Sequence, residues 1–359
     1  MPRRTLLTLP ALGAAAVGLT VLVRGGVGPE EVPPMPEGVR EPQRHDYGSD
    51  PSQFGELTLP AGLPRGVAVV VHGGFWKTAY GIEYARPLVP SLVEQGWATW
   101  AIEYRRVGKG EGGGGGNVMV EEGLMERWSI DEVYGLHNMP GHPVGAFAIR
   151  GGPLLAAADE FDIIITGQGG HAAAPHEAID TNLAAAHVVV ALQSIAARNV
   201  DPIKNAVVSV CTLRSDTDSH NVLPQTVRLR GTVRTLDAGI RDLVQDRLEA
   251  VVAHTCAAHQ CTADIVYARG YPITVNADAN TAYAADVAEN IAPGVDRDTP
   301  PIMAGEDFSY MLNQRPGAYI MLGNGDGPTV HHPMYNFNDD AIPAGCSWFA
   351  EMIETRLPA

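Results

Sequence analysis

The chain has 359 residues, of which 45% are apolar and 18% are charged. This composition is that of a globular protein long enough for two or three domains, and it excludes a disordered chain. The formal net charge of −16 argues against nucleic acid as a partner, because phosphate binding requires a basic surface.

The first residues have the pattern of a targeting segment. A positively charged start, Met1-Pro-Arg-Arg, precedes an apolar run over residues 5–23. This pattern is typical of an export signal or a membrane anchor, so we expect an exported or membrane-anchored protein, or a cytoplasmic one if the segment is not recognised. Residues 25–44 are rich in Pro, Gly and Glu, and we expect a linker there.

A parallel β-α-β unit is expected within residues 45–110. Residues 67–71 are a β-branched run, which is typical of a strand buried on both faces. A helical pattern follows at about 84–95 and a second strand at 98–104. Two strands joined through a helix predict a parallel pair with a right-handed crossover.

Two glycines follow the first of these strands, in His72-Gly-Gly-Phe-Trp76. The N–H groups of Gly73 and Gly74 suit an oxyanion hole, although a βα turn that requires glycine is the favoured explanation. Three further motifs accompany them: Tyr47-Gly-Ser-Asp50, Ser52-Gln-Phe-Gly55 and Glu103-Tyr-Arg-Arg106. Together these residues, 44–108, resemble the front of an α/β-hydrolase of the esterase and arylformamidase type. No G-x-S-x-G nucleophile elbow occurs in the chain, so the resemblance implies a remnant of an oxyanion hole without its nucleophile.

A glycine tract over residues 109–116 separates this part from the rest. After it the pattern predicts a helix at 118–126 and a strand at 132–136. A two-layer β-α-β-β-α-β unit follows, with helices on one face of an antiparallel sheet. Its elements are expected at 161–166, 179–197, 206–213, 226–234, 238–259 and 262–267. A helix at 281–291, a strand at 318–322 and a helix at 344–355 complete an α/β layer.

Histidine-containing motifs recur along this second part. They are Tyr134-Gly-Leu-His-Asn138, Gly169-Gly-His-Ala-Ala-Ala-Pro-His176, His220-Asn-Val-Leu-Pro224, Gly231-Thr-Val-Arg-Thr235, Ala304-Gly-Glu-Asp-Phe308 and the segment from Val330 to Asp339. A single histidine is more often structural than a ligand. The series in this order is very similar to the hippurate hydrolase and indole-acetyl-amino-acid amidohydrolase group of dinuclear metallo-aminoacylases and carboxypeptidases, from about Glu111 to the end of the chain.

The resemblance implies a fold and a reaction. In that family a metallopeptidase-like catalytic α/β domain binds two divalent metals, often Zn or Mn, and an inserted α+β lid dimerises. The corresponding ranges here are 111–158 and 271–359 for the catalytic domain and 159–270 for the dimerisation lid. The family's reaction is hydrolysis of N-acyl amino acids at the amide bond by a metal-activated water, with a glutamate as general base.

The resemblance also implies roles for particular residues. Glu111, His137 and His331 correspond to metal ligands. His171 corresponds to a lid residue that reaches the partner subunit's site and stabilises the oxyanion. Asn221 would position the substrate and Arg234 would hold its free carboxylate, although an exposed strand arginine is an equal alternative. Glu306 and Asp307 are expected to support the site from behind its ligands.

Two departures from the family pattern qualify this hypothesis. The metal-binding loop Cys-Gly-His-Asp-Gly-His has no counterpart in the chain. Of the family's adjacent glutamates, Glu111 aligns with the ligand and Gly110 stands where the base belongs. Loss of a general base removes about 10²–10⁴ in rate. The sequence therefore predicts a reduced or inactive amidohydrolase fused to an α/β-hydrolase fragment, with two alternatives: an α/β-hydrolase esterase, or a non-catalytic dimerising fusion protein.

Overall fold

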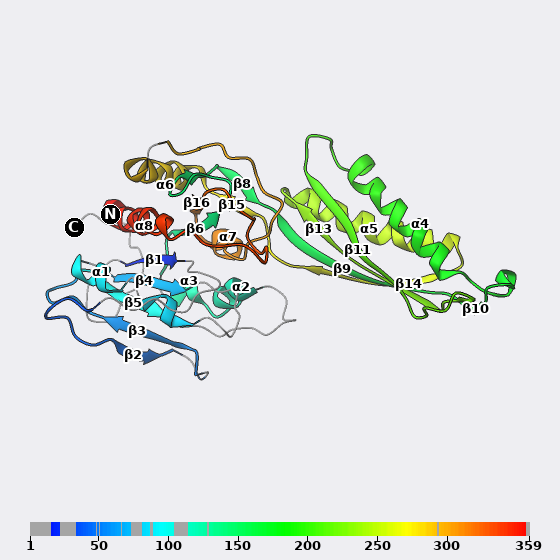
Figure 1. The fold of residues 1–359 in the computed structure, drawn as a ribbon, viewed down its shortest axis with the longest axis horizontal. Coiled ribbons are helices and arrows are strands. Elements are labelled where there is room, and N and C mark those ends of the chain that lie inside the picture. Colours follow the sequence, from blue (N-terminus) through cyan, green and yellow to red (C-terminus); the bar gives the residue numbers. More distant parts are fainter. Residues whose placement is uncertain are drawn as a thin grey trace. The chain divides into compact units, whose positions relative to one another are not determined.

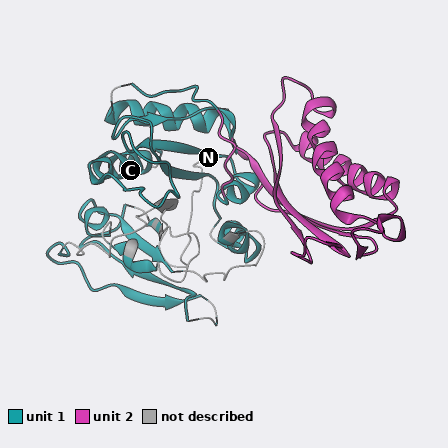
Figure 2. Ribbon diagram, turned by 45° about the vertical axis from the view of Figure 1, so that its right-hand side comes forward, with its two compact units in different colours: residues 1–154, 275–300, 307–359 teal, residues 155–274, 301–306 magenta. Residues whose placement is uncertain are grey.

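The computed structural model describes residues 16–21, 34–47, 49, 51–65, 67–72, 81–86, 89–103, 114–127, 129–292 and 294–356. The chain divides into two compact units, coloured separately in Figure 2. Unit 1 comprises residues 1–154, 275–300 and 307–359, and unit 2 comprises residues 155–274 and 301–306. The predicted boundaries of the catalytic domain and the lid stay predictions beside these ranges.

Unit 1 is built on a sheet with the strand order β2-β3-β5-β4-β1-β6-β16-β7 (Figure 1). Its strands are β1 (Ala16–Val21), β2 (Gln43–Asp46), β3 (Phe54–Thr58), β4 (Val67–His72), β5 (Ala98–Ile102), β6 (Val133–Met139), β7 (Phe147–Ala148) and β16 (Gly317–Gly323). The run from β5 through β4, β1 and β6 to β16 is parallel, whereas β2, β3 and β7 join antiparallel. Parallel strands place their carboxyl ends at one edge of the sheet, which is where α/β folds keep their functional residues.

The remaining elements of unit 1 are mostly helical. They are η1 (Ile82–Tyr84), α1 (Val89–Glu94), α2 (Gly114–Glu121), α3 (Leu124–Arg127), α6 (Asp278–Ile291), α7 (Ser309–Gln314), η5 (Asp339–Ala341) and α8 (Ile342–Arg356). Two short strands, β8 (Gly152–Leu155) and β15 (Thr274–Asn276), pair with each other.

Helix α8 joins the N-terminal residues to the rest of unit 1. Its Trp348 and Phe349 pack into one apolar cluster with β6 and β16, while its Ile353 packs into another with β4, β5 and α1. An ion pair at 2.6 Å between Arg65 and Glu354 lies beside the second cluster. The N-terminal piece is therefore packed against the helix that closes the chain.

Three sequence predictions for the N-terminal part need correction. Residues 16–21, inside the expected signal or anchor, form strand β1, which pairs in parallel with both β4 and β6. An apolar run rich in Val and Leu suits a buried strand as well as a membrane segment, and the pattern alone does not distinguish them. Residues 43 and 44, at the end of the expected linker, begin strand β2. Helix α2 begins at Gly114, inside the glycine tract and four residues before the predicted start.

The predicted β-α-β unit is present, since β4 and β5 are parallel and α1 lies between them in the chain. Among the described residues, no helix is both long and apolar enough to cross a membrane. Localisation stays a prediction.

Unit 2 has the predicted order of elements. Its sheet, β11-β13-β9-β14, is antiparallel throughout, and α4 and α5 cover one face (Figures 1 and 2). The elements are β9 (Ala157–Thr166), β10 (Gly170–His171), η3 (Pro175–Glu177), α4 (Thr181–Ser194), η4 (Ile195–Asn199), β11 (Ala206–Ser215), β12 (Val222–Leu223), β13 (Thr226–Thr235), α5 (Ala238–Ala258) and β14 (Thr262–Arg269).

The core of unit 2 lies between this sheet and its helices. Alternate residues of β9, such as Ile163 and Ile165, are fully buried against Leu192 of α4 and Leu248 of α5. Side-chain oxygens cap both helices, because Asp180 accepts from the N–H of Leu183 and Asp237 from that of Ile240. The segment 301–306 also belongs to this unit: the N–H of Ala156 donates to the carbonyl oxygens of Ile302 and Ala304.

Candidate active site

His137 lies near the carboxyl end of β6. This is the side of the sheet on which the parallel strands have their carboxyl ends. Its Nδ1 is 2.6 Å from the carbonyl oxygen of Asn138. A carbonyl oxygen only accepts, so Nδ1 carries the proton and Nε2 carries the lone pair. Burial lowers the pKa of this imidazole, which keeps the ring neutral. A neutral ring whose one nitrogen is hydrogen-bonded to the backbone is the usual state of a metal-ligating histidine.

His331 lies in the loop that follows β16. It is exposed, and its φ of 69° places it in the left-handed region. The loop is folded back on itself, since the N–H of His332 donates to the carbonyl of Thr329 and the N–H of Tyr335 to that of His332. The hydroxyl of Tyr335 donates in turn to Oδ1 of Asn138, next to His137. The structure thus ties the loop that carries His331 to the strand end that carries His137.

His171 and Asn221 belong to unit 2 and are brought together by the pairing of β10 with β12. The N–H of Ala172 donates to the carbonyl oxygen of Asn221 at 3.1 Å. Nδ1 of His171 accepts from the N–H of Ala173 at 3.0 Å. An accepting Nδ1 places the proton of a neutral ring on Nε2, so the exposed side of His171 offers a hydrogen-bond donor.

Arg234, near the end of β13, is directed toward its own unit. Its Nη1 donates to the carbonyl oxygens of Asp159 at 3.2 Å and Val233 at 3.0 Å, and to the hydroxyl of Thr232. The side chain is partly buried. A role toward a substrate carboxylate stays a prediction, and it requires the guanidinium to leave these partners.

Asp307 holds the start of helix α2. Its Oδ2 accepts from the N–H of Gly116 at 2.9 Å, as a carboxylate does at a helix N-terminus. A Cβ at Gly116 would lie 2.6 Å from the carbonyl oxygen of Asp307. Glycine is therefore required at this position by a close backbone approach, and Asp307 acts on the segment that follows the predicted ligand Glu111.

The donor set for a metal is only partly described. Glu111, Gly73 and Gly74 lie outside the described residues. Within the described ranges, no three His, Cys, Asp or Glu side chains form a group able to hold a metal ion. His137 has the protonation state of a ligand, but the described residues by themselves do not complete a metal centre.

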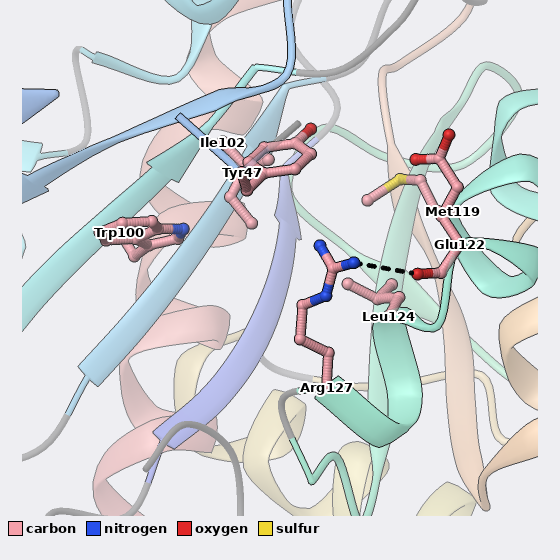
Figure 3. A pocket seen from close by; sticks show the side chains of 7 residues that line it. All are labelled: Tyr47, Trp100, Ile102, Met119, Glu122, Leu124 and Arg127. Carbon is pink, nitrogen blue, oxygen red and sulfur yellow. Dashed lines mark hydrogen bonds between the residues drawn. The ribbon is translucent and has the colours of Figure 1, made fainter. Parts of the chain in front are cut away.

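A separate pocket opens between the N-terminal strands and helices α2 and α3 (Figure 3). Its empty volume is about 390 Å³, and its lining residues are Tyr47, Trp100, Ile102, Met119, Glu122, Leu124 and Arg127. The guanidinium of Arg127 is 3.5 Å from the carbonyl oxygen of Glu122. None of the predicted site residues that the structure describes is among these lining residues.

Sequence reasoning missed three residues of the His137 region: Asn138, Asn324 and Tyr335. Asn138 and Tyr335 lie inside the motifs 134–138 and 330–339, but only the histidines of those motifs carried an expected role. Buried amide side chains are hydrogen-bonded in nearly all proteins, and a motif with an asparagine directly after a ligand candidate was the available signal.

Comparison with known proteins decides the family. A model of peptidase family M20/M25/M40 matches residues 107–355. The chain belongs to this family. Every residue assigned a metal-binding or catalytic role by sequence lies inside the M20/M25/M40 match, whereas Gly73 and Gly74 lie before it.

Two curated relatives with different named activities are similar to this chain. N-acetyl-L-cysteine deacetylase of Bacillus subtilis (strain 168) is 38% identical over 232 residues, which are 65% of this chain and 55% of that protein. Hippurate hydrolase of Campylobacter jejuni is 33% identical over 244 residues, which are 67% of this chain and 63% of that protein. The chain thus spans about half to two thirds of the length of these curated relatives.

A solved structure shares the fold. The Bacillus subtilis YXEP protein, described as a dinuclear metal-binding peptidase from the M20 family, has a TM-score of 0.64 at 20% identity, over 88% of this chain and 88% of that one. This share is larger than the stretch from 107 to 355, so residues before 107 take part in the likeness. The N-terminal piece therefore takes part in an arrangement like that of the family's fold, although the family match begins at residue 107.

Proposed function

We propose that this chain hydrolyses N-acyl amino acids at the amide bond with the help of a divalent metal, Zn or Mn. The observation that supports the proposal best is the family match over residues 107–355, which contains Glu111, His137 and His331. These three residues would hold the metal, and the bound metal would supply a Lewis acid that activates water.

The lid residues have separate tasks in this proposal. His171 donates from Nε2 to the oxygen of the scissile carbonyl as negative charge develops there. The hydrogen bond from Ala173 supports this role because it places the proton on Nε2. Asn221, held beside His171, orients the substrate, and Arg234 binds the free carboxylate once its present partners are exchanged.

The experiment that tests the proposal is metal-dependent amide hydrolysis. The purified chain is stripped with a chelator, its metal content is measured, and release of amino acid from N-acetyl-cysteine and hippurate is followed with and without added Zn or Mn. We expect hydrolysis with metal that His137→Ala abolishes and that His254→Ala, on the surface of α5, leaves unchanged. Hydrolysis that survives complete metal removal would contradict the proposal, as would no hydrolysis of any N-acyl amino acid with metal bound.

The position of Gly110 predicts a low rate that one substitution raises. We infer that Gly110→Glu supplies a carboxylate where the family has its general base and increases kcat by up to about 10²–10⁴-fold. Lys109→Glu is the matched control, because it adds a carboxylate one residue away. Equal kcat values for Gly110→Glu and Lys109→Glu would show that the low rate has another cause. A parent chain with a high kcat would show that a carboxylate at position 110 is not required.

We also propose that two copies pair through unit 2, so that His171 serves the partner's site. The sheet of unit 2 ends in strands β11 and β14, and their side chains Leu213 and Val266 are 52% and 64% exposed. Exposed apolar residues along open sheet edges favour association. Light scattering should give a dimer that Leu213→Asp weakens, and a monomer at all micromolar concentrations would contradict it.

The resemblance of residues 44–108 to an α/β-hydrolase is proposed as ancestry, not as esterase activity. Only the sequence motifs of residues 44–108 support this view, because a parallel unit such as β4-α1-β5 is common to many α/β folds. Because the chain has no nucleophile elbow, a fluorophosphonate probe should not label it, and stoichiometric labelling would revive the esterase alternative.

A further inference from the structure

Asn324 is a nearly fully buried amide just after β16. It is 7% exposed. Its Oδ1 accepts from Nδ2 of Asn138 at 3.0 Å and from the N–H of Asn338 at 2.7 Å. Its Nδ2 donates to the carbonyl oxygen of Asn336 at 3.0 Å. Both ends of this one side chain therefore hold the segment that follows the His331 loop.

Asn138 uses its backbone and its side chain in different directions. Its carbonyl oxygen accepts from Nδ1 of His137. Its amide accepts from the hydroxyl of Tyr335 and donates to Asn324. Asn138 thus holds the ring of His137 through its carbonyl oxygen. Through its amide it also holds Tyr335, which lies four residues after His331 in the same loop.

Most side chains of the loop are exposed. Residues 326–329 and 331–334 are exposed, whereas Tyr335 and Phe337 are partly buried and Phe337 packs against the apolar cluster of β6, β16 and α8. An exposed loop held by few apolar contacts opens easily. The amide network is a set of side-chain hydrogen bonds that connects this loop, and the segment after it, to the strand ends.

We propose that Asn138, Asn324 and Tyr335 are positioning residues that set His331 relative to His137. The proposal rests on the proposed function, because both histidines are the metal ligands of that function. The hydrogen bonds of these three residues fix the position of the loop before a metal binds. Metal binding then costs less conformational entropy than it would if a mobile loop had to be ordered. Removal of one hydrogen bond in the network should loosen the loop while leaving the rest of unit 1 unchanged.

Tyr335→Phe is the sharpest test, since it removes one hydroxyl and keeps the ring. The matched control is Tyr283→Phe, which removes a hydroxyl bonded to the carbonyl of Met352 elsewhere in unit 1. Hydrogen exchange is measured by mass spectrometry on the metal-free full chain. Loss of one hydrogen bond should speed exchange in residues 325–338 about 3- to 10-fold in Tyr335→Phe, with no change there in Tyr283→Phe. Unchanged exchange in Tyr335→Phe overturns the proposal, whatever the amidase assay shows.

Cobalt binding supplies a second readout that a merely structural role would not change. Co²⁺ is titrated into the parent and both variants, and its visible absorption reports the affinity. Groups that orient ligands are worth about 10–100-fold in metal affinity, so Tyr335→Phe should weaken Co²⁺ binding about 10-fold and Tyr283→Phe should not. Equal affinity in Tyr335→Phe and the parent overturns the proposal. No Co²⁺ binding by the parent counts against the proposed function instead, and the exchange experiment then decides the positioning role alone.

Discussion

Unit 2 and the N-terminal part of unit 1 are held together in different ways. In unit 2 the whole four-stranded sheet comes from one continuous stretch of chain, residues 157–269, and buried residues alternate along β9. In unit 1 the middle of the sheet is β4-β1-β6, which takes its strands from residues 67–72, 16–21 and 133–139. Alternation marks such a strand of unit 2 in the sequence, whereas the centre of the unit 1 sheet is built from parallel strands, which carry continuous apolar runs without such alternation.

The largest effect that would sharpen this comparison is expected in β1. Leu19→Pro removes an N–H from a strand that is paired on both sides, a position that sheets essentially never give to proline. Hydrogen exchange should then show unit 1 unfolding while unit 2 keeps its protection. Leu63→Pro, in an exposed segment outside the strands, is the control. If Leu19→Pro leaves unit 1 as protected as the parent, the central position of β1 is wrong.

A buried carboxylate should decide the stability of unit 2. Asp159 is 1% exposed and accepts from Arg241, from the hydroxyl of Tyr267 at 2.9 Å and from the N–H of Gly270 at 3.1 Å. Asp159→Ala leaves the guanidinium of Arg241 without this partner, and breaking a buried pair costs about 3–5 kcal/mol.

Asp162 provides a control in the same strand. It pairs with Arg228, whose side chain is 54% exposed, and an exposed pair is worth about 0–1 kcal/mol. Denaturant unfolding followed by exchange in unit 2 should therefore show a much larger loss for Asp159→Ala than for Asp162→Ala. Equal losses would mean that burial does not govern these two pairs.

The smallest effect concerns the cap of α5 and depends on pH. The hydrogen bond from Lys204, together with the N–H of Ile240, lowers the pKa of Asp237. Asp237→Ala should cost about 1 kcal/mol at neutral pH, as loss of a helix cap does. Because the folded pKa is depressed, the contribution is present above the unfolded value of about 4 and is lost as pH falls through the folded value.

The measurement for Asp237 is the free energy of unfolding of parent and variant between neutral and acid pH. The difference between them should shrink as pH falls below about 4. Asp264→Ala, on the exposed face of β14, is the control and should change little at any pH. A difference that grows on acidification would contradict the assignment of the cap.

The sequence predicted the elements of unit 2 more closely than those of the N-terminal part of unit 1. In unit 2 the predicted helix at 238–259 corresponds to α5 (Ala238–Ala258) and the predicted strand at 226–234 to β13 (Thr226–Thr235). Amphipathic periodicity is a local property, and it specifies such elements well. Strand β1, within the apolar run at 5–23, was not predicted, because a strand of a parallel sheet has no such periodicity and its neighbours in the sheet leave no local pattern.

The candidate site shows the same contrast. Family motifs predicted His171 and Asn221, which the structure places together through β10 and β12. They also predicted His137, whose hydrogen bond to the backbone suits a ligand. They did not predict the amide of Asn324, because its partners Asn138 and Asn338 lie 186 and 14 residues away, and neither spacing leaves a periodic signal.

Unit 2 consists of two separate stretches of the chain, and both are required if the unit is to be expressed alone. A fragment that encodes residues 155–274 alone omits 301–306, whose carbonyl oxygens accept from the N–H of Ala156. Such a fragment would expose the first strand of its sheet at the point where the chain enters. Joining residues 301–306 to the fragment through a short flexible linker would restore these acceptors, so that the excised piece begins and ends with the hydrogen bonds it has in the whole protein.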